Sequence, residues 1–371
     1  MSMRLPVYLD YHATTPCDPE VIDAMVPFFG SEKFGNTYAR SHQNGRRAAQ
    51  ALAHAKEDTA SLLNAAPEML TMTSGATESN RMVCEIAPSG RTEILISALE
   101  HPSVVNAAQE SGLSVKVIPA NPDGFILPEA LKALISKKTR LVSVMLASHE
   151  IGTIQPVQEL AEISHAAGAL FHCDATQAVG RIPVDATMLG VDFLSFSAHK
   201  FYGPQGIGGL YARSGMVPRA GTVPLALAVG MGAACRIAAQ TMADEAQRLR
   251  NLADTLLKAL QSSLPEMRVN GALSPRLPGS LNLCFPGLDA EEMLLDLVAD
   301  LCLSTGAACA SRTRKPSPVL KAIGLSDEDI AGSIRLSLGR MSTHDDVLYA
   351  AEKVIDACLM QRKSCISRAC Q

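Results

Sequence analysis

The sequence lacks an excess of charge of either sign. Charged residues make up 19% of the 371 residues, and the formal net charge is -4. A weakly acidic chain without a basic cluster does not favour nucleic-acid binding, and the absence of an acidic tail argues against disorder. We therefore expect a small-molecule partner and no direct contact with nucleic acid.

The usual marks of metal and disulfide sites are also missing. The 10 cysteines form no CxxC pair and have no close histidine partners. This spacing argues against both a disulfide framework and a structural zinc site. No HExxH motif supports a metal hydrolase. We expect no metal site, and we expect most cysteines to be small buried apolar residues.

Signals for export and membrane insertion are missing as well. The start, MSMRLPVYLDYH, has no charged region followed by an apolar one, and no uncharged apolar run of membrane-spanning length follows. The sequence therefore predicts a cytoplasmic protein that does not associate with a membrane.

What the sequence does contain is an alternation of apolar runs and helical patterns. Strand-like runs occupy residues 69–74, 93–97, 140–148, 169–174, 192–197 and 206–213. Helical patterns follow several of them, which is typical of βαβ units around a mostly parallel sheet. A long helical pattern starts at Arg236, after a Gly/Pro/Ala-rich passage without charged periodicity. Shorter runs beyond it predict a smaller α+β unit, so we expect a large domain at 15–240 and a small domain from 1–14 and 241–371.

Lys200 lies in the stretch SFSAHKFYGPQGIGG (195–209), between a predicted strand and a series of glycines. A lone lysine after a strand is usually solvated, but these glycines allow the backbone to approach a ligand closely. TSGATES (73–79) joins a strand to a helix, and a helix amino end favours a phosphate. Asp174 ends an apolar run, where a helix cap is the alternative interpretation.

Pyridoxal phosphate (PLP) is the cofactor that these features fit together. Its aldehyde condenses with a lysine amine, its phosphate needs N–H and hydroxyl donors, and its ring nitrogen needs an anion to stay protonated. Lys200 is therefore the candidate for the covalent link to the cofactor.

A series of motifs runs in one order along nearly the whole chain. They are YLDYHATTP (8–16), FGNTYARSHQNGRRA (34–48), TSGATESN (73–80), HEIGTIQP (149–156), HCDATQAVG (172–180), SFSAHKFYGPQGIG (195–208), LPGSLNLCFPG (277–287), STGAACAS (304–311) and SIRLSLGR (333–340). With these motifs the chain resembles the class V aminotransferase family, and more narrowly the cysteine desulfurases. The resemblance implies the fold type I of PLP-dependent transferases, an α/β fold with a mostly parallel seven-stranded sheet and a smaller α+β domain. It also implies a homodimer that converts L-cysteine to L-alanine.

The resemblance further implies a role for individual residues. The catalytic residues would be Lys200, Cys309 and His101, with His101 stacked on the pyridine ring. Asp174 would pair with the ring nitrogen, and Gln177 with the ring hydroxyl. The phosphate would be held by Ala76, Thr77, Ser197, His199 and, from the other subunit, Thr222. Arg335, assisted by Asn36, would bind the substrate carboxylate, and His149 would touch cofactor and substrate. A helix-cap role for His101 and a solvent-facing Arg335 remain alternatives.

Cys309 decides which reaction is expected. It lies among small residues before Arg312, Arg314 and Lys315, whose charges favour a thiolate. A buried structural cysteine is the alternative. The resemblance implies a loop nucleophile that takes the substrate sulfur as a persulfide and passes it to an acceptor protein. An iron–sulfur scaffold, a tRNA-thiolation protein, a DNA-modifying complex or another carrier would all fit.

Other functions stay open. A selenocysteine lyase or a class V aminotransferase would not need Cys309. A non-catalytic relative that acts as a binding partner is favoured by departures from the family pattern. Ser148 and His149 replace a usual asparagine pair, and the segment between Tyr211 and Thr222 is shorter than usual. Because Lys200, Asp174 and Cys309 are all retained, we favour an enzyme.

Overall fold

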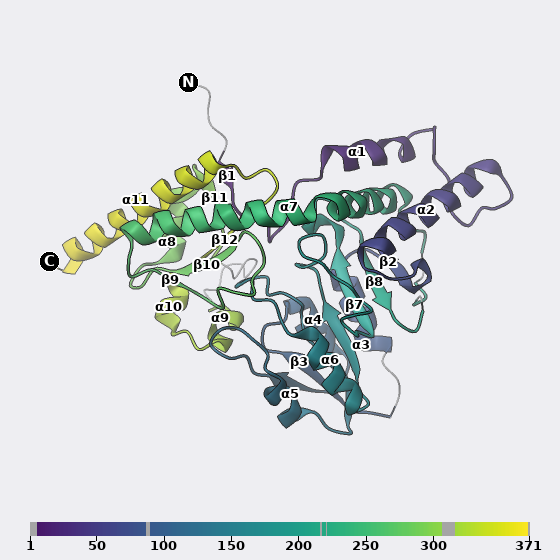
Figure 1. The fold of residues 1–371 in the computed structure, drawn as a ribbon, viewed down its shortest axis with the longest axis horizontal. Coiled ribbons are helices and arrows are strands. Elements are labelled where there is room, and N and C mark those ends of the chain that lie inside the picture. Colours follow the sequence, from purple (N-terminus) through teal and green to yellow (C-terminus); the bar gives the residue numbers. More distant parts are fainter. Residues whose placement is uncertain (1–5, 87–89, 216, 220, 306–315, 370–371) are drawn as a thin grey trace.

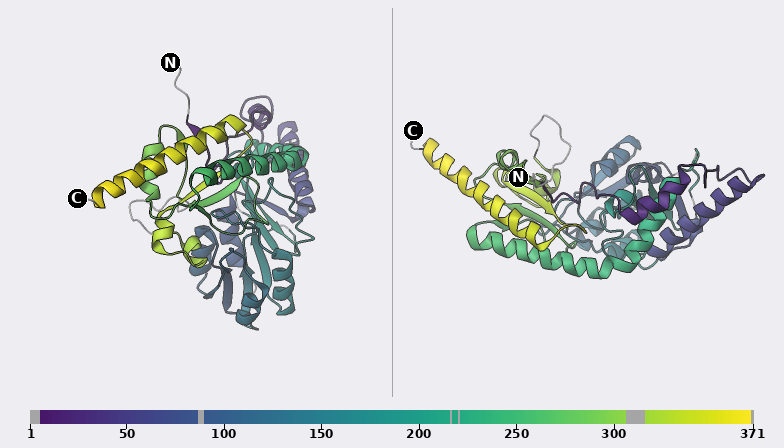
Figure 2. Two further views of the ribbon diagram at one scale, coloured as in Figure 1. Left: turned by 60° about the vertical axis from the view of Figure 1, so that its left-hand side comes forward. Right: turned by 90° about the horizontal axis from the view of Figure 1, so that it is seen from above.

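A computed structural model describes residues 6–86, 90–215, 217–219, 221–305 and 316–369, with side chains up to residue 364. Two units of different make-up lie along one long helix, α7, which crosses the top of the view (Figure 1). Seen from above, α7 curves along one side of both units, and the C-terminal helix α11 lies beside it (Figure 2).

The larger unit contains a seven-stranded sheet in the order β2-β8-β7-β6-β5-β3-β4. Its strands are β2 (Leu70–Thr73), β3 (Glu93–Ser97), β4 (Ser114–Ile118), β5 (Thr139–Ser143), β6 (Leu170–Asp174), β7 (Phe193–Ser197) and β8 (Gly208–Ala212). β8 pairs antiparallel with both of its neighbours, and the other pairs are parallel. The predicted mostly parallel seven-stranded sheet is confirmed. The edge strand β4 was not predicted, because its partly exposed residues form no continuous apolar run.

Helices and short 3₁₀ turns connect the strands of this sheet. They are α1 (Pro19–Met25), η1 (Val26–Phe28), α2 (Gln43–Leu62), η2 (Pro67–Met69), α3 (Ala76–Ile86), α4 (Pro102–Glu110), α5 (Pro128–Leu134), α6 (Val157–Ala166) and η3 (Ala198–Lys200). The apolar strands β3, β6 and β7 lie almost entirely within the core, as expected for parallel strands covered on both faces.

The smaller unit combines short strands with helices on the C-terminal side of the chain. An antiparallel sheet contains β9 (Arg268–Val269), β10 (Ser280–Cys284) and β12 (Ser333–Ser337), while β1 (Val7–Tyr8) pairs in parallel with β11 (Leu301–Cys302). The helices are α8 (Ala290–Leu297), α9 (Pro318–Ala322), α10 (Asp327–Ala331) and α11 (His344–Ala369). The expected α+β unit is present, and the boundaries at residues 14 and 240 stay predictions.

Helix α7 (Leu225–Ser263) begins earlier than the predicted start at Arg236. Its first turns are apolar on all sides, because they pack closely against other chain segments and need no polar face. A Cβ atom on Gly232 would lie 2.8 Å from Ala55 Cα, and one on Gly230 would lie 2.4 Å from Met25 Sδ. By length and composition α7 could cross a membrane, but 56% of its apolar stretch is buried inside the structure, as in the core helix of a soluble protein.

The glycines after Lys200 include one that is required by close packing. A Cβ atom on Gly208, in β8, would lie 2.3 Å from the Phe196 carbonyl oxygen and 2.8 Å from Gly75 Cα. Both neighbours are backbone atoms that cannot rotate away. The close approach of β8 to Gly75 therefore sets the position of the turn that leads into α3.

We predict that Gly208→Ala lowers the free energy of unfolding by about 1–3 kcal/mol, because the added methyl group overpacks two backbone segments. Urea unfolding curves measure the effect. Gly30→Ala is the matched control, since a Cβ there meets nothing within 4 Å. Equal midpoints for the two variants would contradict the packing argument.

Candidate functional site

A cavity of about 200 Å³ lies at the carboxyl ends of the central strands, where open α/β sheets bind ligands. Nine of the predicted site residues line it, namely Ala76, Thr77, His101, His149, Asp174, Gln177, Ser197, His199 and Lys200. They come from the ends of β6 and β7, the start of α3, the residue before α4 and the loop after β5. The structure thus brings most of the predicted site together.

The amino end of α3 forms one corner of the cavity. Ala76 N–H donates to Ser197 Oγ at 2.7 Å, which ties the start of the helix to the end of β7. Thr77 is exposed to the cavity, and His199 Nδ1 is 3.0 Å from Thr14 Oγ1. N–H groups, hydroxyls and a helix amino end are suited to an anion such as phosphate.

Asp174 supplies the carboxylate at the end of β6. Its Oδ2 accepts a hydrogen bond from Asn80 Nδ2 at 2.9 Å, and its Oδ1 accepts one from Thr176 N–H at 3.0 Å. The carboxylate thus caps the turn after β6, although no helix follows. Asn80 was not predicted as a site residue. The available signal was its position one helical turn after Ala76 in TSGATESN, which places both on one face of α3.

The Lys200 amine is held by backbone carbonyls next to the cavity. Its Nζ donates to His12 O at 2.6 Å and to Ala13 O at 2.8 Å. Burial, followed by the positive charges of Arg181 and Arg335, lowers the pKa of Lys200 to about 8. An appreciable fraction of the amine is therefore neutral near pH 7, as a nucleophile or general base requires.

The histidines around the cavity are neutral groups. His101 caps α4 by accepting from Ser103 N–H at 3.1 Å, and its ring packs edge-on against His149 with centroids 5.4 Å apart. The cap role and the cavity role of His101 therefore coexist. Burial lowers the pKa of His101, lowers that of His149 well below its usual value, and lowers that of His199 to about 4. These imidazoles can give and accept hydrogen bonds without adding charge.

Arg335, in β12, is buried rather than solvent-facing, with only 3% of its surface exposed. One Nη donates to Asp10 Oδ1 at 2.6 Å, and the other donates to the His149 carbonyl at 3.1 Å. The Nε–H has no partner among the described residues. The solvent-facing alternative is wrong, and a donor remains for an anionic group.

Several buried polar atoms around the cavity also have no hydrogen-bond partner among the described residues. They are His149 Nδ1, Thr176 Oγ1 and Gln177 Oε1, in addition to Arg335 Nε. Because buried polar groups are normally satisfied, this cluster fits a polar ligand with both donors and acceptors. The chemistry of PLP, with a phosphate, a ring nitrogen, a hydroxyl and an aldehyde, fits this set of groups.

Within the described chain, three predicted residues do not line the cavity, namely Arg335, Asn36 and Thr222. Asn36 and Thr222 are both exposed, and Asn36 Oδ1 accepts from Tyr38 N–H at 2.9 Å. Cys309 lies outside the described residues. The roles of Asn36, Thr222 and Cys309 therefore stay predictions.

A second buried carboxyl group, that of Glu100, supports the cavity wall. Glu100 Oε1 accepts from Ser97 Oγ at 2.6 Å and from the N–H of Met145, a lining residue, at 2.8 Å. Burial, together with the nearby Asp174 charge, raises the pKa of Glu100 to about 8. Glu100 is therefore mostly protonated at neutral pH.

We predict that Glu100→Gln changes how stability depends on pH. The raised pKa means that the protonated Glu100 stabilises the fold fully below the unfolded-state value near 4.5, and this contribution is lost as the pH rises towards about 8. Gln keeps the acceptor oxygen and cannot ionise. The free energy of unfolding of Glu100→Gln, relative to that of the native chain, should therefore increase by about 1 kcal/mol or more as the pH rises across this range. Denaturant unfolding at pH 5 to 9 measures the difference, with Glu129→Gln, an exposed position, as control. If the free energy of unfolding of Glu100→Gln changes with pH in parallel with that of the native chain, the prediction is wrong.

Comparisons with known proteins agree with this geometry. The aminotransferase class-V family model matches residues 7–218 and 215–349, and the two parts overlap within the segment between Tyr211 and Thr222. The cysteine desulfurase IscS of Rickettsia akari is 38% identical over 95% of this chain and 91% of its own length. A solved structure of a NifS-like protein has a TM-score of 0.87 at 30% identity, covering 95% of this chain and 99% of that one. Another solved structure, SspA in complex with cysteine, has a TM-score of 0.76 at 28% identity, over 91% of this chain and 100% of that one. The chain therefore belongs to the class V aminotransferase family and, within it, to the cysteine desulfurases, which convert L-cysteine to L-alanine and transfer its sulfur.

Proposed function

We propose that this chain carries out the desulfurase reaction with PLP bound in the cavity around Lys200. The observation that carries the proposal is the meeting of the Lys200 amine, the Asp174 carboxylate and the amino end of α3 at one cavity. PLP needs an amine, an anion for its ring nitrogen and a phosphate site. When bound, PLP supplies an electron sink for the cleavage of bonds in an amino-acid substrate.

The phosphate would lie at the amino end of α3, between Thr77, Ser197 and His199. Ala76, whose N–H already reaches Ser197, would form the base of this site. Thr222 is exposed on the single chain, so it is free to complete the phosphate site of a second copy. The enzyme would then be a homodimer.

The ring would be held from its edge and its face. Asp174, positioned by Asn80 and Thr176, would keep the ring nitrogen protonated. The unpartnered Gln177 Oε1 would accept a hydrogen bond from the ring hydroxyl. His101, neutral and at the cavity edge, would stack on the ring.

The substrate would be L-cysteine, which is also the ligand named for one of the structural relatives. Arg335 would bind its carboxylate through the unpartnered Nε–H and by exchange with Asp10, with Asn36 assisting. His149 would contact the substrate through its unpartnered Nδ1. Because the pKa of His149 is low, its ring is a neutral hydrogen-bond donor or acceptor near Arg335.

Lys200 and Cys309 would carry the two parts of the reaction. The neutral Lys200 amine would remove the α-proton of the substrate as a general base. The Cys309 thiolate would attack the substrate sulfur, and the new S–S bond would form as the bond between the β-carbon and sulfur breaks. The electron pair would stay with the carbon, which takes up a proton and leaves in L-alanine. A thiol of an acceptor protein would take the outer sulfur by exchange, a step suited to the reducing cytoplasm.

We predict that Cys309→Ala abolishes L-alanine formation from L-cysteine and leaves PLP binding intact, because only the sulfur nucleophile is lost. An alanine assay, a sulfide assay and the near-visible absorbance of the protein measure these properties. Cys17→Ala, at a partly buried cysteine that does not line the cavity around Lys200, should keep full activity. Turnover that survives Cys309→Ala would favour a selenocysteine lyase or a class V aminotransferase.

We predict that Lys200→Ala removes the near-visible absorbance due to the covalent bond with PLP and lowers turnover by about 10²–10⁴-fold, the usual contribution of a general base. Absorbance spectra and steady-state rates provide the measurement. Lys138→Ala, at an exposed loop position, is the control. A native chain without this absorbance in the presence of PLP would instead favour a non-catalytic binding partner.

A further inference from the structure

Arg181 contacts the backbone of Lys200 but does not line the cavity. It follows Gly180, whose φ of +74° suits glycine and whose added Cβ would lie 2.6 Å from Phe201 Cβ. The segment that follows β6 therefore lies directly against the chain after Lys200. From this position Arg181 Nε donates to the Lys200 carbonyl at 3.1 Å, and Nη2 donates to the Tyr11 carbonyl at 2.6 Å.

These two carbonyls, of Lys200 and Tyr11, belong to two segments that are also joined through the Lys200 side chain. Lys200 Nζ donates to the His12 and Ala13 carbonyls, directly after Tyr11. One guanidinium thus joins the backbone of Lys200 to the segment that receives its amine, and the hydrogen bonds form a closed ring. This ring of hydrogen bonds restrains both the backbone of Lys200 and the position of its Nζ atom.

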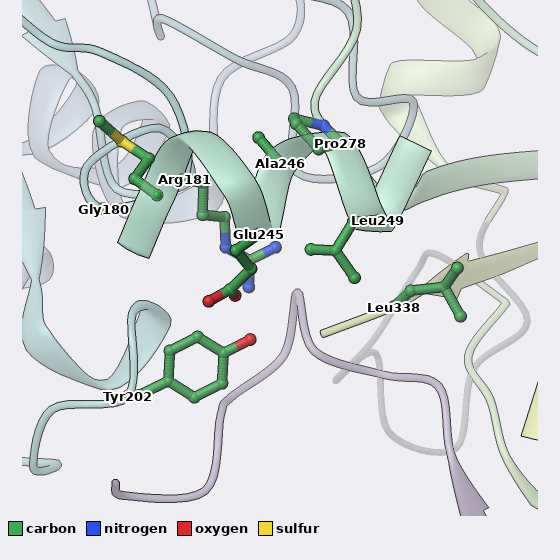
Figure 3. Close-up of a pocket in the computed structure, with 9 residues that line it drawn as sticks. Gly180, Arg181, Tyr202, Glu245, Ala246, Leu249, Pro278 and Leu338 are labelled. Atoms are coloured by element: carbon green, nitrogen blue, oxygen red, sulfur yellow. The ribbon is translucent and has the colours of Figure 1, made fainter. Parts of the chain in front are cut away.

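Acidic and aromatic groups also lie near the guanidinium and act on its charge. Arg181, Tyr202 and Glu245 line a small cavity of about 10 Å³ beside α7, and Figure 3 shows Arg181 and Glu245 close together above the Tyr202 ring. Glu245 Oε2 accepts from Arg340 Nε at 2.9 Å. Arg181 is therefore placed between an acid on the long helix and the backbone of Lys200.

We propose that Arg181 is a positioning residue for Lys200, holding the lysine backbone and the Tyr11–Ala13 segment in one arrangement. The inference rests on the proposed function, in which Lys200 bonds to the cofactor and transfers protons. Arg181 does not line the cavity and would touch neither cofactor nor substrate. Its effect on the reaction would pass entirely through Lys200.

The charge of Arg181 adds an effect that can be measured. Burial is the largest cause of the lowered Lys200 pKa, and the charges of Arg181 and Arg335 lower it further, whereas Asp174 and Asp10 raise it. Four histidines also lie near this lysine and have their own pKa lowered mainly by burial, namely His12, His101, His149 and His199. Since these imidazoles are neutral at physiological pH, Arg181 and Arg335 are the cations among the described residues that act on the amine.

The test measures the Lys200 amine directly in the full-length protein freed of cofactor. The rate of acylation of Lys200 is followed against pH by mass spectrometry of its peptide, for the native chain, Arg181→Met and Arg181→Lys. Arg181→Met, which removes the charge, should raise the apparent pKa of Lys200 by about half a unit or more, and so reduce acylation at pH 7 about threefold. Arg181→Lys should keep a pKa close to the native value.

Arg276→Met is the matched control, because Arg276 is also partly buried and its acceptors among the described residues are backbone carbonyls, in the loop before β10 and at the start of that strand. It should leave the titration of Lys200 unchanged even if it lowers stability. In the loaded enzyme, Arg181→Lys should lower kcat more than it raises KM for L-cysteine, since the ammonium cannot hold both carbonyls in the same geometry. If Lys200 titrates in Arg181→Met as it does in the native chain, the inference is wrong. Failure of the proposed function would be seen separately, as missing PLP absorbance in the native protein.

Discussion

The candidate site depends on the parallel register between β6 and β7, which pairs Asp174 with Ser195. Because both strands run in the same direction, the carboxylate at the end of β6 and the residues after β7 leave the sheet at one edge. β7 continues to Ser197, and the turn η3 carries Lys200 back beside that edge. A slip of one residue would turn Asp174 to the other face of the sheet and separate it from Asn80 on α3. The apolar core residues of both strands prevent this slip, so packing far from the chemistry positions the charged groups.

Burial then determines the charge state of these groups. It is the first cause of the lowered pKa of Lys200 and of the neighbouring histidines, and of the raised pKa of Glu100. Desolvation makes neutral forms favourable wherever no opposite charge compensates. Arg335 keeps a carboxylate partner in Asp10, whereas the acceptors of Lys200 among the described residues are backbone carbonyls. Near the cavity there is therefore a permanent cation, which could attract an anionic group, and an amine that can lose its proton.

The sequence predicted the site better than it predicted the parts that support it. Motifs at strand ends placed Lys200 and Asp174 at one cavity, because the parallel pattern requires strand ends to meet, and the resemblance to the family placed His101 there. The start of α7 was missed, since its first turns are surrounded by other helices and show no polar face. Arg181 was missed for another reason. Within the described part of the chain its side chain bonds to backbone carbonyls, and the identities of those residues leave no pattern in the sequence around it. Contacts of this kind depend on the folded path of the chain.

The two units of the chain meet close to Lys200, through Tyr202. This residue has a φ of +66°, a conformation that costs a non-glycine residue about 1 kcal/mol or more and persists only where surrounding contacts impose it. Its N–H donates to Thr15 Oγ1 at 2.8 Å, and its carbonyl accepts from Asp18 N–H at 2.9 Å. The guanidinium of Arg340, from the smaller unit, lies 4.0 Å from the centre of its ring and also binds Glu245 on α7. The strained residue next to the lysine turn is thus held by the N-terminal segment, by the smaller unit and, through Arg340, by the long helix. A movement of the smaller unit along α7 would therefore displace the backbone near Lys200 through the contact between Arg340 and Tyr202.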